Sequence, residues 1–158
     1  MLQQGDEAAR EARRDWMGIL ARAPLDSLET WARGEILAGT LPVRSWLRRP
    51  ETGLVMVRAR AGGTGERFNF GEMTLTRCAL RLDSGQVGVA YVQGRSQRKA
   101  ELAAIADALL QAEPWRDVLQ RGLIEPLRQQ LADSAARMQR KAQATRVEFF
   151  TLARDAGT

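Results

Sequence analysis

The spacing of apolar residues changes twice along this chain of 158 residues, and this change constrains the fold more than any other feature. Apolar side chains recur at the helical period up to residue 38, β-rich runs separated by turn signals replace this pattern between 44 and 92, and the helical period returns over 96–144. Strands grouped between helices, without alternation of single strands and helices, favour an α+β fold with an antiparallel sheet. The length fits a single domain.

Helices flank the expected sheet at its N-terminal side. They are expected over residues 6–38, where Asp6 fits the N-cap of the first helix. An antiparallel meander is expected over 44–92. Within it, Arg48 to Gly53 has the composition of a turn, and Gly62 to Gly71 forms a connection that is long for a hairpin. Loops of that length are often functional.

Long helices are expected at the C-terminal side, over residues 96–144. Ser96 fits an N-cap, and Pro126 marks a point where the last helix kinks or divides. That helix carries an excess of basic residues, which suits either an acidic partner or a solvated face. A β-like apolar tail over 146–152 can add an edge strand or dock onto a partner.

Two residue counts limit the chemistry that this chain can perform. It has no histidine and a single cysteine, Cys78. The commonest general base and metal ligand is therefore absent, and one cysteine forms no intrachain disulfide and holds no iron–sulfur cluster. Cys78, Tyr91 and Trp115 are expected to be buried apolar residues. We expect no catalytic residue, no metal and no cofactor bound by this chain.

Charge and hydropathy narrow the classes of partner. The chain has 24 basic and 19 acidic residues, a net charge of +5, which permits an anionic ligand or an acidic partner surface. No run of 18 apolar residues and no signal-peptide pattern is present, so we expect a cytoplasmic protein that does not bind a membrane. Aromatic residues make up only 6%, and no nucleic-acid-binding motif is visible, so nucleic acid is not an expected ligand.

The densest group of candidate binding residues surrounds a glycine-rich stretch. Strand alternation puts Arg58 and Arg60 on one face, and Arg77 can join them if the strands pair in a suitable register. Guanidinium groups beside the N–H groups of a glycine turn suit a polyphosphate. They equally suit ion pairs with a partner subunit, or a tight turn beside a solvated face. The candidate triphosphate or interface contacts are Arg58, Arg60, Gly62, Gly63, Thr64, Gly65, Asn69, Glu72 and Arg77.

Several blocks of the sequence carry a family resemblance. In chain order they span residues 16–23, 53–65, 68–78, 90–95, 100–102 and 145–150. Together these blocks closely resemble the PhnG family, a subunit of the bacterial carbon–phosphorus lyase system. The resemblance covers nearly the whole chain. Many members of this family have a histidine where this chain has Val89 or Lys99, so no catalytic residue is transferred.

The resemblance implies membership of a core complex with the H, I and J subunits. It implies a part in forming α-D-ribose 1-methylphosphonate 5-triphosphate, in which methylphosphonate displaces adenine from C1′ of ATP. ATP is then a substrate of the complex, and the I subunit is the expected main contact and the expected site of the chemistry. The candidate docking residues, from the C-terminal block, are Arg146, Val147, Phe149 and Phe150.

Two other functions compete with an accessory subunit. One is a free-standing basic adaptor without enzymatic context. The other is an autonomous small enzyme that uses Glu72 and the arginine cluster. The ordered sequence blocks favour the subunit.

Overall fold

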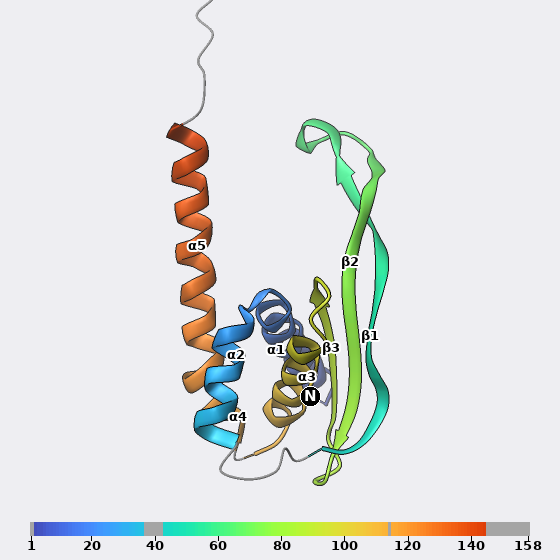
Figure 1. Ribbon diagram of the computed structural model, residues 1–158, viewed down its shortest axis with the longest axis vertical. Helices are drawn as coiled ribbons and strands as arrows, with labels where there is room; N and C mark the ends of the chain where they lie inside the picture. Colours follow the sequence, from blue (N-terminus) through green and yellow to red (C-terminus); the bar gives the residue numbers. More distant parts are fainter. Residues whose placement is uncertain (1, 37–42, 114, 145–158) are drawn as a thin grey trace, which may run out of the picture.

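Helices stand before and after three strands in the computed structural model, which describes residues 2–36, 43–113 and 115–144. The strands form one antiparallel sheet in the order β1-β2-β3, which confirms the expected α+β class (Figure 1). The elements are α1 (Leu2–Arg22), α2 (Leu25–Trp31), a π-helical turn η1 (Ala32–Ile36), β1 (Val43–Arg60), a 3-10 turn η2 (Ala61–Gly63), β2 (Arg67–Leu82), β3 (Val87–Gln93), α3 (Gln97–Leu110), α4 (Trp115–Leu119), a π-helical segment η3 (Gln120–Ile124) and α5 (Glu125–Ala144).

The core lies between one face of the sheet and the helices. Alternate β2 residues are buried on this face, from Thr76 to Leu82, and Cys78 among them is only 1% exposed, as expected. Helix α3 packs on β2 and β3, and α1, α2 and α4 pack around α3. Every side chain from Leu102 to Leu110 is therefore buried. A helix enclosed on all sides needs apolar residues all round, which explains its composition.

Local sequence signals predict the start of α3 and the division before α5, but not the start of α1. The Ser96 side chain caps α3 as expected, accepting a hydrogen bond from the Lys99 backbone N–H at 3.1 Å. Pro126 lies in the first turn of α5, directly after the π-helical η3, so the long helix is divided there as expected. Helix α1 begins at Leu2, four residues before the expected start at Asp6, because leucine and glutamine favour helix.

The turn expected between Arg48 and Gly53 is wrong. Strand β1 continues through this segment, and its register with β2 slips between Arg48 and Glu51. Pro50 cannot donate a ladder hydrogen bond, but it is tolerated because β1 is an edge strand and the pairing is irregular there. Turn-forming composition was therefore overridden by pairing with a long partner strand.

The long connection expected from Gly62 to Gly71 is also wrong. Strand β2 already begins at Arg67, with Phe68 opposite Ala59 and Gly71 opposite Val57. Aromatic residues favour strands, and here they extend the pairing. The consequence is a long two-stranded ribbon that reaches past the third strand and ends in a short turn (Figure 1).

Two aromatic residues expected in the core are exposed. Tyr91 is 50% exposed, because it lies opposite Arg77 on the sheet face away from the helices, while its neighbours Ala90 and Val92 face the core. Side chains alternate along β3 as expected, but the register puts Tyr91 on the outer face and Ala90 and Val92 on the buried one. Trp115, at the start of α4, is 39% exposed.

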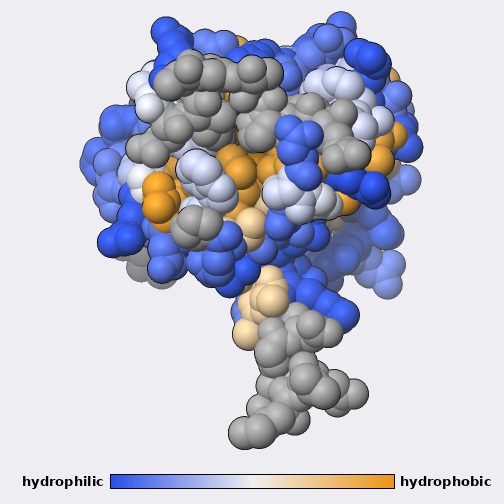
Figure 2. Space-filling view, turned by 90° about the horizontal axis from the view of Figure 1, so that it is seen from below, coloured by the Kyte–Doolittle hydropathy of each residue, from blue (hydrophilic) through white to orange (hydrophobic). Residues whose placement is uncertain are grey.

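The surface of the end opposite the ribbon tip is mainly hydrophilic. Figure 2 shows a small group of apolar residues surrounded by polar ones at this end. Within the described ranges, no helix is long and apolar enough to cross a lipid bilayer.

Candidate functional site

Tight backbone geometry explains the glycines at the ribbon tip. Gly63 has a positive φ of 81°, a conformation that glycine adopts without steric cost. The Gly65 N–H donates to the Ala61 carbonyl oxygen at 3.0 Å. A Cβ at Gly65 would lie 2.8 Å from that same oxygen. These two glycines therefore serve the turn, whatever else the tip contacts.

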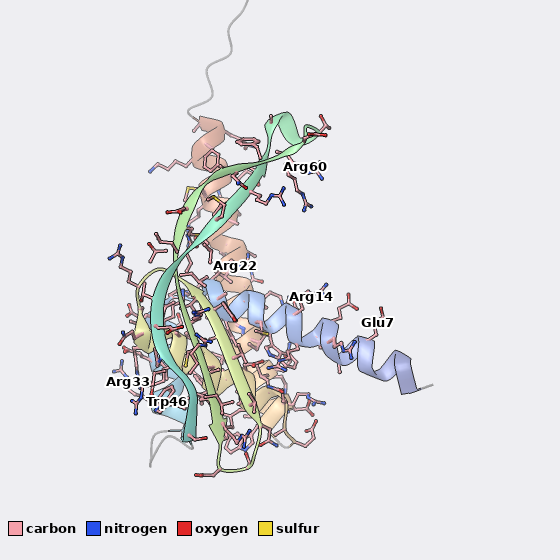
Figure 3. The ribbon with its side chains drawn as sticks, turned by 90° about the vertical axis from the view of Figure 1, so that its right-hand side faces the viewer. Glu7, Arg14, Arg22, Arg33, Trp46 and Arg60 are labelled. Atoms are coloured by element: carbon pink, nitrogen blue, oxygen red, sulfur yellow. The ribbon has the colours of Figure 1, made fainter. Side chains whose placement is uncertain are left out.

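One face of the ribbon tip is strongly basic. Arg58 lies opposite Asn69, and Arg60 lies opposite Arg67, so all four side chains share a face and all are exposed. The Arg60 guanidinium donates to the Gly65 carbonyl oxygen at 3.0 Å and closes the turn. Figure 3 shows Arg60 near the end of the ribbon. The side chains of Arg58 and Arg67 form no hydrogen bond or ion pair with any residue that the structure describes. They are available to an external anion or carboxylate.

Arg77 does not join this basic tip. It lies opposite Glu51, eight residues along β2 from Asn69, which is roughly 26 Å of extended strand. Its Nε donates to Glu51 Oε1 at 2.6 Å, and Arg48 donates to the same oxygen. These hydrogen bonds, first from Arg48 and then from Arg77, lower the pKa of Glu51. Arg77 is thus committed to an ion pair on the outer sheet face, beside a hollow of about 330 Å³.

The nine candidate contacts therefore fall into separate groups. Glu72 is exposed and lies opposite Met56, part-way along the ribbon. Thr64 is exposed at the tip. The tip holds Arg58, Arg60, Gly62, Gly63, Thr64, Gly65 and Asn69, whereas Glu72 and Arg77 lie progressively further down the ribbon.

Two observations on the described part of the chain concern nucleophilic and metal chemistry. Burial, followed by the nearby Glu101, raises the pKa of the Cys78 thiol to about 12, so this thiol is not a nucleophile at neutral pH. No group of three or more acidic residues or cysteines is placed to hold a metal ion among the residues described. An arrangement of exposed arginines on a projecting ribbon is suited to binding.

A buried acidic residue is the main feature that sequence reasoning missed. Asp107 is fully buried in α3, and its two carboxyl oxygens accept hydrogen bonds from Arg13 at 3.1 and 2.7 Å. The Trp16 indole N–H donates to it at 2.8 Å, and the Val89 N–H at 2.9 Å. These hydrogen bonds tie α1 and β3 to α3, which gives Asp107 a structural role. The signal was available: it is the one acidic residue within the apolar run of 102–110.

The candidate docking residues of the C-terminal block, Arg146, Val147, Phe149 and Phe150, lie outside the residues that the structure describes. The same holds for the whole β-like tail expected over 146–152.

Fold and site together define a class of protein. A small α+β body carries a projecting ribbon whose tip exposes several arginines, an arrangement suited to binding an anionic or acidic surface.

Two comparisons with known proteins identify the family. The family model described as phosphonate metabolism protein PhnG matches residues 11–155. A relative from Rhizobium meliloti (strain 1021), α-D-ribose 1-methylphosphonate 5-triphosphate synthase subunit PhnG, is 42% identical over 154 residues, covering 94% of this chain and 93% of its own length. The chain belongs to the PhnG family. This confirms the family resemblance and the class of synthase subunit in phosphonate metabolism.

Proposed function

We propose that this chain is an accessory, non-catalytic subunit of α-D-ribose 1-methylphosphonate 5-triphosphate synthase. It acts with the H, I and J subunits when methylphosphonate displaces adenine from C1′ of ATP. The observation that carries the proposal is the 42% identity, across almost the entire chain, to a subunit of that synthase. The cytoplasmic location expected from the sequence belongs to the same proposal.

The burial of Cys78 and the ion pairs of Glu51 support the accessory role. Displacement at C1′ needs a group that stabilises the departing adenine, and an acid or base is the usual means. In the described residues the Cys78 thiol is buried, and the Glu51 carboxylate is engaged by two arginines. These groups are poorly placed for such a step, so the reacting groups are assigned to a partner, with the I subunit as the first candidate.

The basic tip is proposed to contact a partner subunit rather than the triphosphate of ATP. A triphosphate site would need several arginines to converge on one point. Arg58 and Arg67 share the tip with Arg60, but Arg60 closes the turn and Arg77 pairs with Glu51 far down the ribbon. ATP is thus a substrate of the complex, and we propose that this chain binds no cofactor of its own.

Reconstitution tests this function. The H, I and J subunits are purified with and without this chain and supplied with ATP, methylphosphonate and the L protein, which the family resemblance implies as a helper of the G, H and I subunits. The release of adenine is then measured. We expect adenine release only when this chain is present, and none from this chain alone. Equal release without the chain would refute a required role, and release by the chain alone would refute a non-catalytic one.

The C-terminal segment is proposed as a second docking element. It contains Arg146, Val147, Phe149 and Phe150 in one of the blocks that resemble the family. Removing residues 145–158 is expected to abolish co-purification with the I subunit while the remaining chain still folds. Unchanged co-purification of the truncated chain would contradict this proposal.

A further inference from the structure

Two elements project past the body of the molecule at the same end. Strand β3 pairs with β2 only between Leu75 and Arg81, so the ribbon over 52–74 has no third strand beyond the pair formed by Gly53 and Leu75. Helix α5 rises beside the body and continues beyond it, opposite the ribbon (Figure 1). Its side chains over 137–144 are all exposed. We call the ribbon over 52–74 and α5 from residue 133 onward the two arms.

The side of the ribbon arm that faces the helices carries two large apolar residues, with Glu72 beside one of them, opposite Met56. Thr52 and Thr76 lie opposite each other with their hydroxyl oxygens 3.0 Å apart, and Thr76 is buried against the helices. Alternation places Leu54 and Met56 on the same side. Both side chains are mostly uncovered by the described residues, at 61% and 53% exposed.

The helical arm continues a stripe that begins in the core. Leu127 is 2% exposed, and Leu131, one turn later, is partly buried against the core. Ala135, Met138 and Ala142 follow at spacings of three and four residues, so they lie on the same side of the helix. Met138 is 69% exposed. The stripe that packs on the body at the base of α5 therefore faces the ribbon arm above it.

Both arms carry excess positive charge. Together they contain six basic residues and three acidic ones. The basic residues are Arg58, Arg60, Arg67, Arg137, Arg140 and Lys141. A second copy of this chain would bring the same positive charge to the gap, which disfavours self-association there. An occupant with acidic residues beside an apolar stripe would match both the charge and the apolar faces.

We propose that the two arms hold an acidic, amphipathic element of a partner subunit between them, with Leu54 and Met56 on one side and Met138 on the other. The inference rests on the proposed function, which supplies a partner subunit. It explains why a two-stranded ribbon, marginally stable by itself in water, exposes large apolar side chains on the side that faces α5.

Charge substitutions in each arm test the proposal in the co-expressed complex. Leu54→Asp and Met138→Glu are each expected to reduce the partner subunits co-purified with this chain at least tenfold. Val118→Glu is the matched control, since Val118 on α4 is also exposed, at 42%, and lies outside the arms. Neither arm variant should change the melting temperature of the isolated chain. Normal co-purification of either variant, or equal loss with Val118→Glu, would overturn the proposal.

Site-specific photocrosslinking identifies the occupant. A photoreactive amino acid at Met56 or at Met138 is expected to crosslink the same partner subunit in the assembled complex. Crosslinks from the two positions to different subunits, or to another copy of this chain, would overturn the inference. Adenine release by the unmodified complex is measured in parallel. Loss of release would contradict the proposed function, whereas the crosslinks test only the occupant of the arms.

The predicted acidity of the occupant has its own test. Reversing Arg137 and Arg140 to glutamate is expected to weaken assembly at least fivefold, and the loss should be largest at low salt. Reversal of Arg121, which lies outside the arms, serves as the control. An unchanged yield of complex from the double variant would overturn the acidic character assigned to the partner.

Discussion

Asp107 joins three elements of the body through a single side chain. Its carboxyl group accepts hydrogen bonds from Arg13 and Trp16 of α1 and from the backbone of Val89 in β3. Val89 lies on an edge strand, whose unpaired N–H groups invite wrong pairing. Asp107 in α3 therefore attaches α1 and accepts one backbone N–H from the free edge of the sheet at the same time.

Asp107→Asn should destabilise the protein by about 2–3 kcal/mol. An amide presents an N–H₂ group toward donors that need an acceptor, and it removes the charge that balances Arg13. The estimate is below that for a fully buried pair, because the Arg13 side chain is 35% exposed. Urea unfolding should show a lower midpoint with an unchanged slope, whereas exposed Asp133→Asn should have little effect. Equal midpoints for the two variants would contradict the structural role.

The Cys78 thiol should make stability fall with rising pH. Burial raises its pKa from 9.0 to about 12, so the folded state keeps a proton that the unfolded chain loses above pH 9. Its contribution is complete below pH 9 and decreases above it by up to about 1.4 kcal/mol per pH unit. We expect the free-energy difference between the native chain and Cys78→Ala to shrink from pH 8 to pH 10.5 in urea unfolding. Parallel pH profiles would contradict this.

The packing of α3 on β3 depends on one glycine. A Cβ built at Gly88 would lie 1.8 Å from the backbone oxygen of Ala104 in α3. No real contact is that short, so any larger residue would push the helix off the sheet. Strand β3 contains no other glycine, and Gly88 marks the point of closest approach.

Gly88→Ala should therefore lower the melting temperature by about 4–8 °C, which corresponds to about 2 kcal/mol in a chain of this length. Gly53→Ala is the matched control. Gly53 also lies in a strand, but an added Cβ meets no atom within 4 Å there. Calorimetry on both variants measures the difference. A Gly88→Ala chain that melts with the Gly53→Ala chain would show that α3 can shift at little cost.

The molecule as a whole is a packed body with two arms, and the candidate contacts lie mainly on one of them. The basic tip is separated from Glu51 and Arg77 by most of the ribbon. The arginines of the tip and Arg77 are therefore too far apart to contact the same group of a ligand or partner. This separation supports partner contact at the tip and an internal ion pair at Arg77.

Arg58→Lys in the assembled synthase should weaken assembly and leave the KM for ATP unchanged. Lysine keeps the charge but cannot form the two parallel hydrogen bonds of a guanidinium with a partner carboxylate. The yield of complex and the KM are measured on the same preparation, with exposed Arg121→Lys as control. A raised KM in a fully assembled complex would assign Arg58 to the triphosphate instead.

Local signals predicted much of the secondary structure and little of the site. The cap at Ser96, the division at Pro126 and the burial of Cys78 were predicted from short sequence patterns, and all three are confirmed. The extended structure of the segment from Arg48 to Gly53 was not predicted, because its pairing depends on a strand that is distant in the sequence. The convergence of Arg77 with the tip likewise depended on register, which composition does not report.

Residue order alone was enough for the family and the α+β class, because periodicity and ordered motifs are properties of neighbours in the chain. Long-range pairing decided the rest. It turned Tyr91 outward, placed Arg77 on Glu51 instead of at the tip, and buried Asp107 among donors from α1 and β3. These outcomes follow from contacts between residues far apart in sequence, where a shift of one position in register reverses the face that a side chain occupies.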